Sequence, residues 1–381
     1  MASHRITRLT PDVVGECIDK LHEKRRAVRE EGMEALVAAL EGFVSADDID
    51  HRYFTVFDRC CVALRKGSAA EATLAYRVIG LLALSVGSTN DVDCSKDILD
   101  RAVPLLGKTL QAPSSGPATM AAALDCLAAV ALGGARRPLH AASALRAVMG
   151  LIRRAGGDAT ASSPPPEVLT AALSALALLL TIIGDDDLRA YTWDFKMDMI
   201  PFQDLVKLLD SDNTSVLMAA GEALAVCAEL NLTKHASPED MDAIEMKVLD
   251  LATDASGDMT PTEQRQVDFF QKIADIICQG ECPETESSSG GRGVLRVSTW
   301  ARLVQISFLK RFLGKGFRKH MQENPLFRQE EDTSVAADED DEPPTGKCGR
   351  RGSGKGKQWT SAMRRDRDIG WERKNNFSQY D

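Results

Sequence analysis

The chain has 381 residues, which is enough for two or three ordinary domains or for one elongated domain. Ala and Leu dominate its apolar residues, and only 12 Phe, 4 Trp and 4 Tyr are present, so closely packed helices are favoured over a β-sandwich or barrel. The formal net charge of -10 excludes a chain that binds nucleic acid over its whole surface.

The first 280 residues predict a succession of helices. Thr10 as N-cap and Pro11 at the first helical position predict the start of a helix that runs through the charged residues 23–26 to Leu40. Ser237 and Thr260, each followed by proline, predict the starts of two later helices. Further apolar segments at helical spacing lie at 52–64, 70–86, 96–110, 117–132, 138–154, 167–183, 200–210, 215–230, 239–252 and 262–278. No segment alternates apolar and polar residues over the length that a strand needs.

Helices of this length joined by short loops predict an all-α fold, an armadillo/HEAT-like α-solenoid. One helix pair cannot bury its apolar stripe alone, so neighbouring pairs must stack. Alanine lets the helix axes approach closely, and the Ala- and Leu-rich segment 217–230 is typical of the inner helix of such a repeat.

Composition and charge divide the chain into four parts. After a solenoid at 1–280, residues 281–293 are rich in Pro, Glu, Ser and Gly and predict a flexible linker. Residues 292–328 hold nine Arg and Lys against one Glu, and residues 329–345 hold eight acidic and no basic residues. Residues 346–381 hold ten basic and four acidic residues. The remaining residues, 1–291, therefore carry a formal net charge of -16. We therefore expect a basic helical module at 294–328 packed on the solenoid, and a disordered tail at 329–381 that is first acidic and then basic.

The basic module combines apolar and cationic side chains. Its first helix is apolar over most of its circumference, so it must be buried, with Trp300, Phe308 and Phe312 as structural anchors. The basic residues predict a surface that binds phosphates or an acidic partner. The alternative is a packed C-terminal cap with ordinary surface lysines. The predicted partner-binding residues are Arg302, Lys310, Arg311, Lys315, Arg318, Lys319 and His320.

No catalytic constellation is visible in the sequence. The six histidines lie far apart, and Cys278 and Cys282 lack a second pair of metal ligands. Residues 349–355 fit the start of a phosphate-binding loop, but Gly356 replaces the hydroxyl that would bind magnesium, and no apolar strand precedes them. We therefore predict no enzymatic activity, no cofactor, no metal site and no small-molecule substrate.

The remaining signals concern the cellular compartment. The nine cysteines are scattered and mostly lie in apolar helical runs, as expected for reduced core residues. The first ten residues lack the apolar core of a secretory signal, and the longest apolar stretch, 171–183, is shorter than the roughly 20 residues that cross a bilayer. We expect a soluble protein, cytoplasmic or nuclear or both, with no membrane partner.

Four segments, in order along the chain, carry a family resemblance. Residues 297–327, VSTWARLVQISFLKRFLGKGFRKHMQENPLF, resemble the C-terminal motif of the interferon-related developmental regulators. Residues 18–40, 66–87 and 175–230 are similar to segments of that family's helical domain. The resemblance implies an armadillo-like, non-enzymatic protein that acts through protein partners. Residues 350–377 keep the basic character of the family's tail but lack its Ser-Pro-Asn-Ser motif, so contacts made by that tail are not expected to carry over.

Two functions fit these features. Family members are described as factors that bind ribosomes and accompany translational silencing, and as transcriptional co-regulators. The first hypothesis is an acidic scaffold whose basic C-terminal part docks on the ribosome or another RNA-rich surface and regulates translation. The alternative is a nuclear transcriptional co-regulator whose solenoid groove binds peptides of protein partners, with the basic cluster around Arg350 and Arg351 as an import signal.

Overall fold

The computed structural model describes residues 12–49, 51–87, 92–112, 115–135, 138–156, 163–183, 200–253, 260–282, 285–288 and 294–328. All of these residues belong to one compact unit that spans residues 1–333. The tail at 329–381 and its loop-like stretch at 349–356 lie outside the described residues. The first helix does not begin at Pro11 as predicted: it begins at Val13, because the side chain of Asp12 accepts from the N–H of Gly15 and caps the helix. The prediction of an all-α solenoid is confirmed.

Helices make up nearly all of the described chain. The first half contains α1 (Val13–Leu21), α2 (Arg26–Glu41), α3 (Ala46–Ile49), α4 (Tyr53–Lys66), α5 (Ala69–Val86), α6 (Val92–Gln111), α7 (Pro117–Gly134), α8 (Pro138–Gly156) and α9 (Pro166–Ile183). The second half contains α11 (Phe202–Leu208), α12 (Thr214–Glu229), η1 (Leu232–His235), α13 (Pro238–Leu251), α14 (Pro261–Ala274), a π-helical turn η2 (Asp275–Gln279), α15 (Trp300–Leu313), η3 (Gly314–Gly316), α16 (Phe317–Glu323) and α17 (Pro325–Arg328). Ser237 and Thr260 cap α13 and α14 as predicted.

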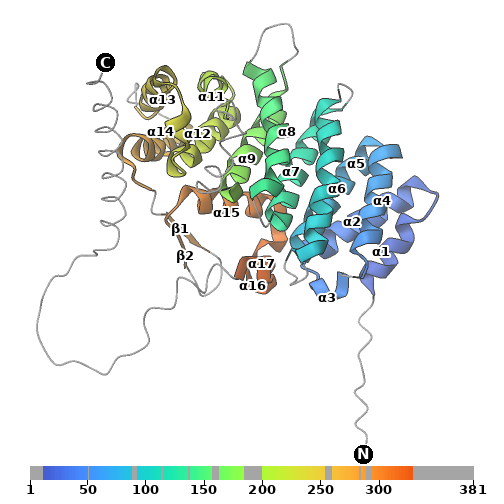
Figure 1. Cartoon of the computed structure of the whole chain (residues 1–381). Coiled ribbons are helices and arrows are strands. Elements are labelled where there is room, and N and C mark those ends of the chain that lie inside the picture. Colours follow the sequence, from blue (N-terminus) through green and yellow to red (C-terminus); the bar gives the residue numbers. More distant parts are fainter. Residues whose placement is uncertain are drawn as a thin grey trace, which may run out of the picture. The chain divides into compact units, whose positions relative to one another are not determined.

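The helices stack in two layers (Figure 1). An inner layer of α2, α5, α7, α9 and α12 is continuous, because each of these helices packs on the next. The outer layer places α1 on α2, α4 on α5, α6 on α7, α8 on α9 and α11 on α12. The pair α13 and α14 continues the stack beyond α12. Each repeat is therefore a helix pair that buries its apolar stripe against its neighbours.

The inner helices are apolar around most of their circumference because they have neighbours on most sides. In α5 and α7 this character makes both helices long and apolar enough to cross a membrane by length and composition alone. Both are nevertheless core helices, with 67% of the one and 56% of the other buried inside the protein. A helix that is apolar all round is equally typical of a buried position in a helical stack.

The sequence predicts one long N-terminal helix where the structure has two. Helix α1 ends at Leu21 and α2 begins at Arg26. The Arg29 guanidinium donates to the carbonyl oxygens of Glu23 and Lys24, at 3.1 and 2.7 Å, and so stabilises the turn between the helices. The charged residues 23–26 have no apolar stripe that burial could stabilise as helix. The side chain of Arg29 instead satisfies the backbone carbonyl groups that the break leaves without helical partners.

A short antiparallel hairpin lies where the sequence predicts part of a flexible linker. Strand β1 (Thr285–Ser288) pairs with β2 (Val294–Val297), with Thr285 opposite Val297 and Ser288 opposite Val294. Four residues are too few for a readable alternation, although the β-branched valines of the second strand favour extended backbone. The hairpin leads directly into α15.

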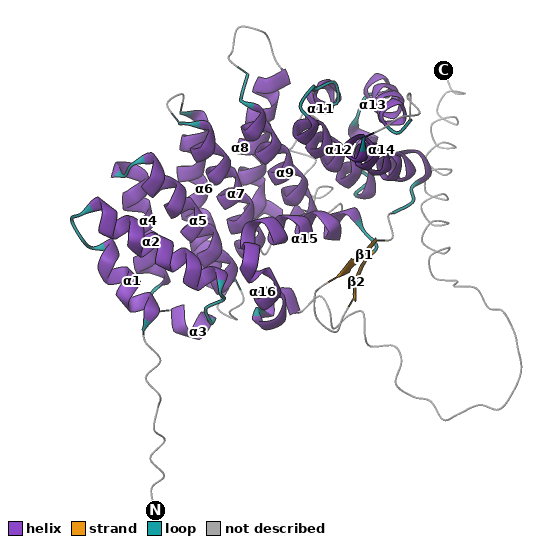
Figure 2. Ribbon diagram, turned by 180° about the vertical axis from the view of Figure 1, so that it is seen from behind, coloured by secondary structure: helices purple, strands orange, loops and turns teal. Residues whose placement is uncertain are grey.

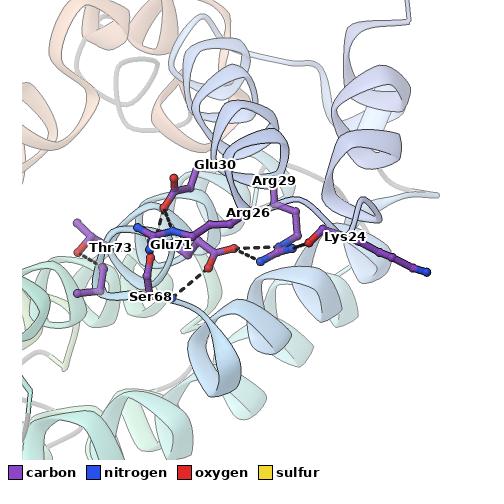
Figure 3. Close-up of polar contacts among 8 residues, drawn as sticks. Lys24, Arg26, Arg29, Glu30, Ser68, Glu71 and Thr73 are labelled. Atoms are coloured by element: carbon purple, nitrogen blue, oxygen red, sulfur yellow. Dashed lines mark hydrogen bonds and ion pairs between the residues drawn. The ribbon is translucent and has the colours of Figure 1, made fainter.

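A buried carboxylate joins the beginnings of α2 and α5 (Figure 3). The side chain of Glu71 is 2% exposed, and its Oε1 accepts from Nε and Nη2 of Arg29, at 2.9 and 2.8 Å. Its Oε2 accepts from the backbone N–H of Ser68 at 3.0 Å, and Oγ of Ser68 accepts from the N–H of Glu71 at 3.1 Å. This capping box and ion pair satisfy both oxygens of Glu71, so the cluster stabilises the joint between two repeats.

Replacing Glu71 with Ala should lower the free energy of unfolding by about 3 kcal/mol, because it leaves a partly buried guanidinium unpaired and removes half of a helix cap. Chemical denaturation measures the change. Glu31→Ala is the matched control: its ion pair with Lys20 is exposed on both sides, so the expected cost is within about 0.5 kcal/mol. Equal costs for the two variants would contradict this role of Glu71.

Candidate functional site

Residues 300–328, from here on called the strap, lie across the inner layer. They comprise α15, η3, α16 and α17. As the strap runs forward in sequence, it contacts α12, α9, α7, α5 and α2, which is the reverse of their order in the chain. The view from behind shows α15 crossing the inner helices and α16 lying near their N-terminal members (Figure 2). The strap thus covers a face of the inner layer that the outer layer does not.

The strap begins on a carboxylate of α12. Oε1 and Oε2 of Glu229 accept the backbone N–H groups of Trp300 and Ala301, at 2.9 and 2.7 Å. Oγ1 of Thr299 accepts from the N–H of Arg302 at 3.2 Å. The first N–H groups of a helix have no partner within it, and an anion there also interacts favourably with the helix dipole. Glu229 therefore fixes both the position and the direction of α15.

Aromatic side chains of α15 anchor the first half of the strap. Trp300 is fully buried, with its ring edge-on to Phe269 at 5.9 Å between centroids. Phe308 and Phe312 stack on each other at 5.3 Å. Phe312 fits against Gly80 of α5, where an added Cβ atom would come within 2.6 Å of the ring, so a larger residue would push the ring away. All three predicted anchors are thus core residues of the interface between strap and inner layer.

The strap ends on the backbone of α2 and α5. Gly316 lies so close to the carbonyl of Glu41 that a Cβ atom would be 1.7 Å from its oxygen, and only glycine fits there. Nε2 of His320 is 2.8 Å from the carbonyl oxygen of Leu40, and Nδ2 of Asn324 donates to that of Leu84 at 3.1 Å. These contacts satisfy carbonyls at the C-terminal ends of the two helices.

Five of the seven predicted partner-binding residues are exposed, and the prediction for one of the other two is wrong. Arg302 is half-buried, and His320 is fully buried, so His320 is not a partner-binding residue. Burial lowers the pKa of His320, and its ring packs edge-on against Phe43 at 5.2 Å, so it works as a neutral core residue. The exposed basic residues of the strap among those predicted are Lys310, Arg311, Lys315, Arg318 and Lys319.

Acidic side chains lie within ion-pair distance of two of the exposed cations. Arg311 pairs at 2.7 Å with Asp125 of α7, whose side chain is half-buried. Lys319 approaches Glu323 at 3.9 Å, and both side chains of this pair are exposed. An exposed pair contributes little free energy, so a phosphate can compete for Lys319. The ammonium nitrogen of Lys310 lies 5.8 Å from the centre of the Phe317 ring. The aliphatic part of the Lys310 side chain therefore packs along the strap.

A second carboxylate of α12 acts on Arg311. Burial raises the pKa of Glu222 to about 7, and the positive charge of Arg311 opposes that rise. Arg311 therefore interacts with Glu222 as well as with Asp125, from two different inner helices. These acidic residues belong to the surface on which the strap lies, so the strap's charge is partly matched by the body beneath it.

Cys278 and Cys282 have no set of neighbouring metal ligands among the described residues. Cys278 is exposed, whereas Sγ of Cys282 donates to Oε1 of Glu229 at 3.3 Å. Burial and the neighbouring carboxylate raise the pKa of the Cys282 thiol to about 12, which disfavours the thiolate that binds metals. No group of three or more His, Cys, Asp or Glu side chains within the described part of the chain could hold a metal ion.

The sequence predicts the aromatic anchors of the strap but not Glu229, Gly316 and Asn324, which also hold it in place. Glu229 offers one signal, because a carboxylate at the C-terminal end of a helix is unfavourable unless it has a partner. The sequence indicates only a helix stop at Asn324 and a helix breaker at Gly316. The partner of Asn324 lies 240 residues away in the chain and that of Gly316 on another repeat, and no local pattern encodes such contacts.

Comparison with known proteins matches most of the chain to one family. The model of the interferon-related developmental regulator family matches residues 7–268. Interferon-related developmental regulator 2 of Mus musculus is 30% identical over 322 residues, which cover 82% of this chain and 70% of that protein. Interferon-related developmental regulator 1 of Homo sapiens is 24% identical over 322 residues, covering 82% of this chain and 68% of that protein.

Among solved structures, two engineered proteins resemble the chain. One covers 84% of this chain and 66% of its own, with 18% identity and a TM-score of 0.45. The other covers 68% of this chain and 97% of its own, with 20% identity and a TM-score of 0.43. At such scores the likeness adds nothing to the helical architecture described above.

Trp300→Ala should lower the free energy of unfolding by about 3–5 kcal/mol, because it removes a fully buried aromatic from the junction of α12, α14 and α15. Trp300→Phe is the control. It keeps most of the volume and removes an indole N–H that has no hydrogen-bond partner among the described residues, so it should cost far less. A Trp300→Ala variant with an unchanged melting temperature would mean that the strap does not depend on this anchor.

Glu222→Gln should stabilise the protein at pH 8 by about 2 kcal/mol and have little effect near pH 4.5. The folded-state pKa of about 7 lies above the ordinary value of 4.5, so the native carboxyl keeps its proton where the unfolded chain loses it. Stability therefore falls as pH rises from about 4.5 to 7, and a neutral amide avoids that fall. Thermal melting of both proteins at the two pH values measures this. A variant that is equally stabilised at both pH values, or not at all, would contradict the titration assigned to Glu222.

Proposed function

The chain belongs to the interferon-related developmental regulator family, and we propose that it acts as a non-enzymatic adaptor whose strap docks on a ribosomal or other RNA-rich surface to regulate translation. The observation that carries this proposal is a set of exposed cations on an element held in place by burial. They are Lys310, Arg311, Lys315, Arg318 and Lys319. Phosphate groups are the partner that such a surface favours most.

Charge distribution supports a defined orientation on the RNA. Residues 1–291 carry a formal charge of -16, so phosphates repel the solenoid and attract the strap. The strap is already ordered on the inner layer, so docking does not incur the conformational entropy cost of folding a free segment. The charge distribution and the ordered strap both favour an encounter in which the strap faces the RNA and the outer layer faces away.

The family and the described chemistry both support the non-enzymatic role that we propose. The relatives are named as regulators. The carboxylates of the buried Glu71 and the half-buried Glu229 are bonded to helix N-termini and, for Glu71, to a guanidinium. Glu229 accepts from the thiol of Cys282, whose raised pKa disfavours the nucleophilic thiolate, and the hydroxyl of Ser68 beside Glu71 belongs to a helix cap. Neither arrangement resembles the activated nucleophile that acyl or phosphoryl transfer requires.

The nuclear co-regulator alternative would use the inner layer as a peptide groove. The strap already lies on that face, from Glu229 of α12 to Leu40 of α2. A partner peptide would first have to displace an element anchored by three buried aromatics, so we favour the RNA-docking function. Location in the cytoplasm with ribosomes follows from that choice and is part of the proposal.

Changing Lys315, Arg318 and Lys319 together to Glu should abolish co-sedimentation with ribosomal particles in a low-salt sucrose gradient while leaving the melting temperature unchanged. We expect the affinity for RNA to fall at least tenfold, and the slope of log affinity against log salt to decrease by about 0.9 for each phosphate that the variant no longer neutralises. Wild-type co-sedimentation should itself weaken as salt rises.

The matched control changes Arg65, Lys66 and Lys108 to Glu. All three are exposed on the solenoid, and the change in net charge is the same. This variant should still co-sediment if the strap, and not the overall charge, binds the RNA. The proposal fails if the wild-type chain does not migrate with ribosomal particles at either salt concentration, or if both triple variants lose binding equally.

A further inference from the structure

Helix α13 carries apolar residues outside its buried stripe. Ile244 and Val248 are fully buried and face α11 and α14, as expected for a surface helix. Met246 and Leu249 lie off that stripe and are 66% and 49% exposed. They are three residues apart, so they are neighbours on one helix face.

This pair differs from the other exposed apolar residues. The large apolar side chains that are exposed in the described part of the chain are Val13, Phe54, Met246 and Leu249. Val13 stands at the first position of α1, and the guanidinium of Arg101 covers the ring of Phe54 at 4.9 Å. Only on α13 do two of them adjoin, and adjoining exposed apolar side chains are typical of an interaction surface.

A pocket of about 340 Å³ lies beside this apolar pair. Its wall includes Leu217 of α12, which is buried, and the exposed carboxylates of Asp210, Asp212 and Asp250. Lys247 is the single cation among the described lining residues, and its ammonium group is bonded to Asp210 and to the carbonyl oxygen of Val206. Carboxylates therefore outnumber cations on this wall, and the pocket favours a positively charged occupant.

Asp250 connects the pocket to the apolar pair. It follows Leu249 directly and lies one turn after Met246, so on a helix of 3.6 residues per turn it stands between that pair and the pocket side of α13. The apolar ridge, the carboxylate and the pocket form one continuous surface. Met246, Leu249, Asp250 and the pocket are called the α13 surface below.

We propose that the α13 surface is a docking site for a basic, amphipathic helical segment of a partner protein. Apolar side chains of the segment would cover Met246 and Leu249, and an Arg or Lys would enter the pocket and pair with Asp212 and Asp250. A flexible methionine adapts to apolar side chains of different shape. The charge complementarity excludes nucleic acid, whose phosphates these carboxylates repel. Since the strap covers the inner layer, this surface gives the adaptor a separate place for a protein partner.

The site is independent of the RNA-docking proposal, because it uses other helices and the opposite charge. An RNA-bound protein could therefore hold a basic partner segment at the same time. A variant of the strap that loses RNA binding should still bind the peptide, and a variant of the α13 surface that loses peptide binding should still bind RNA. Each proposal can therefore fail while the other holds.

The test uses the full chain and a fluorescent synthetic peptide of about 16 residues, with Leu on one helical face and Arg on its flanks. A peptide with Glu in place of every Arg is its counterpart. Fluorescence anisotropy should show saturable binding of the basic peptide alone. Met246→Ser with Leu249→Ser, and separately Asp212→Asn with Asp250→Asn, should each weaken binding at least tenfold, or about 1.4 kcal/mol.

Two controls separate this site from general attraction to an acidic protein. Val13→Ser removes an exposed apolar residue elsewhere and should leave the affinity unchanged, as should the triple Glu variant of the strap. Melting temperatures of all variants should stay near that of the wild type, because the altered side chains are exposed. The proposal is overturned if the basic peptide fails to bind below about 1 mM, or if the α13 variants bind it as tightly as the wild type.

Other occupants would give different results, each of which contradicts a partner segment. A dimer that dissociates when Met246 and Leu249 are changed to Ser would identify a second copy of the chain as the occupant. A chain that ends at residue 333 and binds the peptide much more tightly than the full chain would identify the chain's own basic tail. Sedimentation and the same anisotropy assay distinguish these outcomes.

Discussion

The burial of the strap's aromatic side chains on the inner layer is the interaction on which the rest of the structure depends. A solenoid of helix pairs leaves one side of its inner helices open, and here those helices are apolar almost all round. Trp300, Phe308 and Phe312 cover that side, and Glu229 satisfies the first N–H groups of the helix that carries them. Without this cover a row of apolar helices would face water, and the basic residues of the strap would have no fixed position.

The same burial separates the charges of the molecule. A helix whose apolar side is buried must present its polar side to solvent, and in the strap that side is rich in Lys and Arg. The body beneath it is acidic, with Asp125 and Glu222 both interacting with Arg311. The result is a cationic surface on an anionic scaffold, and on a second, distant helix an acidic surface that includes exposed apolar residues. An adaptor needs two such surfaces of different chemistry.

The helices were predictable because their apolar spacing is a direct consequence of burial in a stack, and the burial of Trp300 followed from an apolar circumference. Features that depend on one specific contact, or on strands of only four residues, were not predictable. His320 resembles its basic neighbours in sequence, but its position is set by the carbonyl of Leu40, 280 residues earlier. The break between α1 and α2 depends on Arg29 reaching back to two carbonyls, and the hairpin consists of strands too short to show a pattern. The apolar pair on α13 could have been noticed as residues outside the helix stripe.

Hydrogen exchange of the full chain, followed by mass spectrometry, tests most directly whether the strap is a fixed part of the inner layer. If the account is right, peptides covering residues 300–313 exchange as slowly as those from α7 and α9, since opening α15 would expose the core of several repeats at once. Exchange of these amides at the rate of an unstructured segment, while α7 and α9 stay protected, would contradict it.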